Sequence, residues 1–154
     1  MITSKKVRFE DLFPIITETV SKGNEFSFCA FGNSMLPFIQ NGKDLVTLGP
    51  VSDQLRAGDI IFYRRKNGQF VLHRIVKVLP DQTYHLCGDN QFRIEKDIQD
   101  MQIIAKLVRL ERSGKEVKLN SFSARLWCLL LPFRRFILHV KSAITYRIQR
   151  LHKN

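Results

Sequence analysis

The sequence predicts a mainly β protein: an antiparallel β-domain with a short helix before it and a basic amphipathic helix after it. Residues 26–119 form short β-rich runs separated by turn residues, whereas residues 8–22 and 121–152 place apolar side chains at helical spacing. A chain of 154 residues fits one domain with a short appendage. We therefore expect an N-terminal helical segment (1–25), a β-rich domain (26–120) and a basic helical tail (121–154).

The first helix is expected over residues 8–22. Its apolar side chains fall on one helical face, and Gly23 follows as a typical helix end. The residues on this face are Phe9, Leu12, Phe13, Ile16 and Val20.

The β-domain is expected to contain about seven strands, because seven β-rich runs are punctuated by turns. A hairpin is expected at Lys66-Asn67-Gly68, since Asn-Gly favours a turn with positive φ at both central residues. A second is expected at Ser113-Gly114. The predicted strands are Glu25–Phe31, Asp44–Leu48, Ile60–Arg64, Gln69–Val78, Thr83–Cys87, Ile103–Glu111 and Glu116–Leu119.

The tail carries most of the basic character of the chain. The formal net charge is +11, and residues 121–154 hold seven Lys/Arg and no Asp or Glu, which leaves +4 for the rest. Two interpretations stay open: an in-plane helix on an anionic membrane surface, or a helix packed on the β-domain with its basic face in water. The apolar stripe of this helix is Phe133, Phe136, Ile137, Val140, Ile144, Ile148 and Leu151.

Composition excludes several classes of protein. Hydrophobic residues make up 44% of the chain, enough for a core. Three cysteines, Cys29, Cys87 and Cys128, argue against a disulfide framework, and the absence of metal-ligand spacing predicts no metal or other cofactor. The polar stretch 1–10 predicts no signal peptide, and no apolar run reaches transmembrane length, so we expect a cytoplasmic or peripheral membrane location.

Three residues at the edges of predicted strands could form a catalytic set. A serine needs a neighbouring base to act as a nucleophile, and imidazole suits this role because it titrates near neutral pH. A carboxylate on the far ring nitrogen would orient the imidazole. Ser34, His73 and Asp89 can fill these roles if their strands converge, although each could also be an ordinary strand or turn residue.

Taken in order, four segments resemble signal peptidase I and its relatives, which are serine endopeptidases with an all-β core related to LexA-like peptidases. These segments are Gly32-Asn33-Ser34-Met35-Leu36-Pro37, Gly58-Asp59-Ile60-Ile61, Val71-Leu72-His73-Arg74-Ile75-Val76 and Gly88-Asp89-Asn90.

The resemblance implies Ser34 as the nucleophile and His73 as the base. Histidine in this position matches the branch of the endoplasmic reticulum and archaea, where the functional aspartate lies a few residues beyond Gly-Asp-Asn. The third member is therefore open between Asp89 and Glu95, and Asp97 is a weaker match.

Two departures from the family pattern bear on function. Gly32 stands where many relatives have a hydroxyl residue that helps the oxyanion hole, so the donors expected here are the Ser34 backbone N–H and Asn33. Relatives that process exported proteins usually have an N-terminal transmembrane anchor, and we expect none here.

The expected function is serine endopeptidase cleavage of extended leader or signal peptides through an acyl-enzyme, including the possibility of a cytosolic leader peptidase. The alternative is a LexA-like or degenerate peptidase fold that binds nucleic acid or a protein without proteolysis. We do not expect nucleic-acid binding, because residues 1–25 are too short for a helix-turn-helix domain. The oligomeric state is not predicted.

Overall fold

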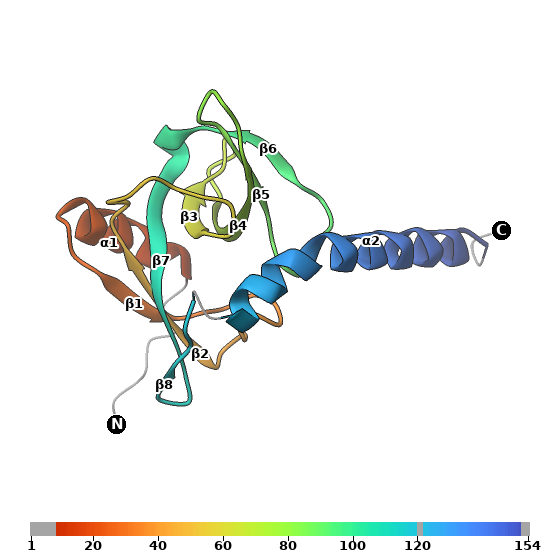
Figure 1. Ribbon diagram of the computed structural model, residues 1–154, viewed down its shortest axis with the longest axis horizontal. Helices are drawn as coiled ribbons and strands as arrows, with labels where there is room; N and C mark the ends of the chain where they lie inside the picture. Colours follow the sequence, from red (N-terminus) through yellow and green to blue (C-terminus); the bar gives the residue numbers. More distant parts are fainter. Residues whose placement is uncertain (1–8, 120–121, 152–154) are drawn as a thin grey trace.

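The computed structural model describes residues 9–119 and 122–151 and shows an antiparallel sheet with a helix at each end (Figure 1). Expectations for residues 1–8, 120–121 and 152–154 lie outside the described residues. The helices are α1 (Phe9–Ser21) and α2 (Phe122–Leu151), with a short 3₁₀ turn at Asp100–Gln102. The strands are β1 (Phe26–Cys29), β2 (Asp44–Gly49), β3 (Ile60–Arg64), β4 (Phe70–Val78), β5 (Tyr84–Cys87), β6 (Glu95–Ile98), β7 (Ile103–Arg112) and β8 (Lys115–Glu116).

The sheet has the strand order β1-β2-β7-β3-β4-β5-β6, and β8 pairs with β7. It curls strongly in its second half. Arg65, directly after β3, reaches the side chain of Glu95 at the start of β6, although β4 and β5 stand between these strands in the sheet order. This curl brings residues from β3, β4 and β6 to one place.

Helix α1 packs into the same core as the sheet. Phe13, Ile16 and Val20 are buried, because their spacing puts them on one helical face. The ring of Phe13 stacks on that of Phe70 with centroids 4.1 Å apart. Burying these side chains anchors the segment before β1 to the β-domain.

Helix α2 begins against the β-domain and then leaves it, so that its C-terminal half projects as a rod (Figure 1). Ala124 and Leu131 are buried, and the helix continues through Pro132. The ring of His139 meets that of Phe92 edge-on at 5.2 Å, and residues 141–150 are all exposed. Within 9–119 and 122–151, no helix combines the length and apolarity that crossing a membrane requires.

The predicted fold class is confirmed, and one strand was missed. Strand β6 was not predicted because its residues Glu95, Lys96 and Asp97 are charged and its burial is slight. The hairpin at residues 65–69 is present, but the expectation for its turn was wrong: Gly68 has a φ of 88° and Asn67 is not in the positive-φ region. Ser113 and Gly114 both have positive φ, as the second predicted hairpin requires.

Candidate active site

Ser34 lies in the loop between β1 and β2, and its side chain is partly exposed. Neither its hydroxyl nor its backbone N–H is hydrogen-bonded to another described residue. The loop is held instead by Asn90, whose backbone N–H donates to the Ser34 carbonyl at 2.8 Å and whose side chain donates to the Asn33 carbonyl at 3.1 Å. The Gly-Asp-Asn segment therefore positions the backbone of Ser34 and leaves its hydroxyl available.

Gly88 lets Ser34 and His73 approach each other. A Cβ on Gly88 would lie 2.6 Å from the Ser34 carbonyl oxygen and 3.1 Å from His73 Nε2. Both atoms thus border one small space that only glycine leaves open. The Nε2 nitrogen of His73 consequently faces the loop that carries Ser34.

His73 is 1% exposed on β4, and its other ring nitrogen faces a carboxylate. Nδ1 lies 3.1 Å from Oε1 of Glu95 and 3.4 Å from the hydroxyl of Tyr63. A carboxylate beside Nδ1 favours the tautomer with its proton on that nitrogen, which leaves Nε2 able to accept a proton. The nitrogen that can accept a proton, Nε2, therefore lies on the side of the Ser34 loop.

Glu95 is itself fixed by a guanidinium. Arg65 donates from Nε to Oε2 at 2.7 Å and from Nη2 to Oε1 at 2.5 Å, which is the bidentate geometry of a strong Arg–carboxylate pair. Burial favours the neutral acid, yet hydrogen bonds with His73, Arg65 and Tyr63 hold the pKa of Glu95 well below its usual range. Burial, together with the neighbouring Glu95, raises the pKa of Tyr63. Glu95 is therefore an ionised partner for the imidazole.

Asp89, the other candidate for the third member, lies elsewhere. It is fully buried and accepts two hydrogen bonds from Arg74, at 2.9 and 2.7 Å, and one from the indole N–H of Trp127 at 2.9 Å. Successive residues of a strand point to opposite faces, so Arg74 and Asp89 lie on the far side of β4 from the imidazole of His73. The expectation that Asp89 could orient His73 is corrected: of the two candidates, Glu95 contacts the ring. Asp97 is exposed and faces His85 at 3.7 Å.

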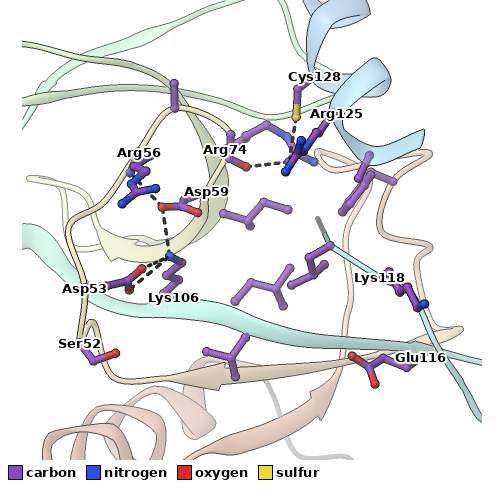
Figure 2. A pocket seen from close by; sticks show the side chains of 18 of the residues that line it. Ser52, Asp53, Arg56, Asp59, Arg74, Lys106, Glu116, Lys118, Arg125 and Cys128 are labelled. Carbon is purple, nitrogen blue, oxygen red and sulfur yellow. Dashed lines mark hydrogen bonds and ion pairs between the residues drawn. The ribbon is translucent and has the colours of Figure 1, made fainter. Parts of the chain in front are cut away.

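The far side of β4 borders a cavity of about 970 Å³ between the loop 50–59, β7 and the start of α2 (Figure 2). Arg74 lines it and also donates to the Gly58 carbonyl at 2.9 Å. Asp53 and Asp59 pair with Lys106 on the cavity wall. Ser34, His73 and Glu95 are not among its lining residues, so this cavity is separate from the Ser-His-Glu set.

The two expected oxyanion donors are placed differently. The backbone N–H of Ser34 has no acceptor among the described residues, which leaves it available for a developing oxyanion. The side-chain oxygen of Asn33 lies 3.5 Å from the Asn41 amide. Gly32 has a φ of 112°, a conformation that disfavours the hydroxyl residue found in many relatives.

Sequence reasoning missed the residues that support Glu95 and Asp89. Tyr63 lies on the strand paired with β4: Ile61 is opposite His73, and Tyr63 is two residues further on the same face. The hairpin register could have indicated this neighbour. Arg65 and Trp127 had no comparable signal, because their contacts depend on the curl of the sheet and the docking of α2.

Asp89→Asn should lower the stability of the protein. The substitution removes the charge that compensates the Arg74 guanidinium, which is only 4% exposed. Breaking one side of a buried pair costs about 3–5 kcal/mol. We expect this loss in the free energy of unfolding measured by urea titration, whereas Asp97→Asn, at an exposed site, should change it by less than about 0.5 kcal/mol. Equal stabilities would contradict the structural role of Asp89.

Comparison with known proteins agrees with this fold. The family model described as Peptidase S24-like matches residues 2–108, more than half of the chain, so the chain belongs to this family. The family covers signal peptidase I and LexA-like peptidases. The matched range contains Ser34, His73 and Glu95 and ends before α2. Searches of curated proteins and of solved structures gave no significant match.

Proposed function

We propose that the protein is a serine endopeptidase of the signal-peptidase type, which cleaves extended leader or signal peptides with Ser34 as nucleophile. The observation that carries the proposal is the order of the groups: Glu95 on Nδ1 of His73, and Nε2 on the side of the Ser34 loop. This is the arrangement that a serine nucleophile needs for activation.

Ser34 and His73 carry out the steps of the proposed reaction. His73 Nε2 takes the proton of the Ser34 hydroxyl as its oxygen attacks the peptide carbonyl, and the Ser34 N–H stabilises the oxyanion. His73 then gives the proton to the leaving amine as the peptide bond breaks, which leaves an acyl-enzyme. Attack by water, with His73 again taking a proton, releases the new carboxyl end and restores Ser34.

An extended peptide segment fits the surroundings of Ser34. The nucleophile lies in a partly exposed loop, and Phe31, which is 68% exposed, presents apolar surface three residues before it. The hydroxyl of Ser34 has no competing acceptor among the described residues. An intact Ser-His-Glu set favours catalysis over a role as a binding scaffold alone.

The proposal can be tested by digesting a peptide library derived from a whole proteome and identifying the new termini by mass spectrometry. We expect cuts that share a sequence pattern on both sides of the cleaved bond. A fluorophosphonate, which modifies activated serines, should leave its adduct on the tryptic peptide that contains Ser34. No cleavage by folded protein, or an adduct on Ser52 in place of Ser34, would contradict the assignment.

A further inference from the structure

We infer that α2 binds an anionic lipid surface along an apolar face that points away from the β-domain. We call this face the exposed stripe. It extends over most of the helix and consists of Leu126, Leu129, Leu130, Phe133, Phe136, Ile137, Val140 and Ile144, which are between 38% and 75% exposed. Side chains of this kind rarely form a continuous exposed surface unless it has a partner.

The exposed stripe lies opposite the face that docks on the protein. A helix turns by about 100° per residue, which places the stripe on one side and the buried Ala124 and Leu131 on the other. The docking face is fixed by polar contacts: Trp127 donates to Asp89, and Arg134 donates to the Asp89 carbonyl at 3.1 Å and to the Asn90 side chain at 2.7 Å. The β-domain therefore cannot cover the stripe without breaking these contacts.

The length of α2 suits a surface that is larger than a groove in a small protein. Thirty residues make a helix of about 45 Å. Its last ten described residues before Leu151, 141–150, are exposed on every side (Figure 1). A long apolar stripe suits an extended surface, into which an interfacial helix inserts one face.

The charges beside the stripe favour anionic lipid over a second copy of the chain. Residues 122–151 contain six Lys/Arg and no acidic residue. Two such helices pairing through their stripes would bring cations together with no anions to offset them, unlike helix pairs with complementary flanks. Arg125, Lys141, Arg147 and Arg150 lie beside or at the edge of the stripe, where lipid phosphates would meet them.

Lipid binding would also set the position of the candidate active site. Asn90 joins the docking face of α2 to the Ser34 loop, through Arg134 on one side and the Ser34 carbonyl on the other. With the stripe in the lipid, these contacts hold the loop close to the membrane surface. This consequence rests on the proposed peptidase function, whereas the lipid binding itself does not.

The test is co-sedimentation of the full chain with vesicles of phosphatidylcholine alone or mixed with phosphatidylglycerol. We expect binding to the mixed vesicles that weakens at high salt. Phe133→Gln combined with Ile144→Gln should lower the partition coefficient by about tenfold or more, since both side chains lie at the centre of the stripe. Lys141→Gln with Arg147→Gln should remove the preference for phosphatidylglycerol. Tyr146→Gln is the matched control, because Tyr146 is 67% exposed but lies off the stripe. This variant should bind vesicles as strongly as the wild type.

Several outcomes would overturn the inference. The first is that the protein does not bind vesicles. The second is that the stripe substitutions leave vesicle binding unchanged. The third is that Tyr146→Gln weakens vesicle binding as much as the stripe substitutions do. A dimer that depends on the stripe, detected by light scattering without vesicle binding, would assign this face to a second copy. Salt-sensitive binding of duplex DNA in place of vesicles would assign the basic residues to nucleic acid. Vesicle binding requires no catalysis, so these results are independent of the proposed peptidase activity.

Discussion

Ser34→Ala is expected to lower kcat for a cleaved library peptide by about 10⁶-fold, the loss that follows when the nucleophile or base of a catalytic triad is removed. The physical reason is that the loop carrying Ser34 borders the same small space beside Gly88 as His73 Nε2, so the variant removes the hydroxyl that the proposed reaction activates. The Ser34 hydroxyl makes no hydrogen bond to a described residue, so the midpoint of thermal unfolding should stay the same. Peptide turnover is measured by mass spectrometry and unfolding by circular dichroism.

A matched control separates loss of chemistry from loss of a serine. Ser52 is exposed and lies on the rim of the cavity on the far side of β4 (Figure 2). Ser52→Ala should cleave at the wild-type rate. Turnover that persists in Ser34→Ala, or that falls equally in both variants, would be inconsistent with Ser34 as the nucleophile.

The structure brings the Ser34 loop to the imidazole of His73, which is the convergence that the expected catalytic set requires. This was predictable because both residues sit in segments with strong local signals, a turn after an apolar run and a half-buried strand. The third member was not decidable from sequence. Its choice depends on how far the sheet curls and on the register of β6, a short charged strand whose pairing with β5 contains a register shift.

For the tail too, features that depend on neighbouring residues were predictable from the sequence, whereas contacts with distant residues were not. The helical period of residues 121–152 predicted the helix and five residues of the exposed stripe, Phe133, Phe136, Ile137, Val140 and Ile144, but not Leu126, Leu129 and Leu130. It could not indicate which face docks, because Trp127 and Arg134 bind the Gly-Asp-Asn segment more than thirty residues earlier. Of the two interpretations, a helix packed on the β-domain describes only the first part of α2, where Ala124 and Leu131 are buried, whereas residues 141–150 are exposed.

Glu95→Gln is the second large effect that we expect, with kcat lowered by about 10⁴-fold, as when the orienting carboxylate of a triad is made neutral. The amide introduced by this substitution can present its N–H₂ to Nδ1 of His73, which favours the tautomer with its proton on Nε2, the wrong nitrogen for a base that faces Ser34. The substitution also leaves Arg65 without its bidentate partner. Single-turnover kinetics with the same peptide measures the loss.

Two controls distinguish Glu95 from the other carboxylates. Asp97→Asn changes the same strand two residues away, at an exposed site, and should retain wild-type turnover. Asp89→Asn should lower stability, and under conditions where it remains folded it should retain more turnover than Glu95→Gln, because Asp89 contacts Arg74 and not His73. The opposite ranking would make Asp89 the functional carboxylate.

The pH dependence of stability gives an independent check on Glu95. Its pKa is lowered in the folded state relative to about 4.3 in an unfolded chain, so its ionised form stabilises the fold above that value. This contribution is lost as the pH falls through the lowered folded-state pKa. The difference in unfolding free energy between wild type and Glu95→Gln should therefore be full at neutral pH and shrink below about pH 4. A difference that stays constant over this range in urea titrations would mean that Glu95 is not held ionised by His73 and Arg65, and the orientation of the imidazole would then need another cause.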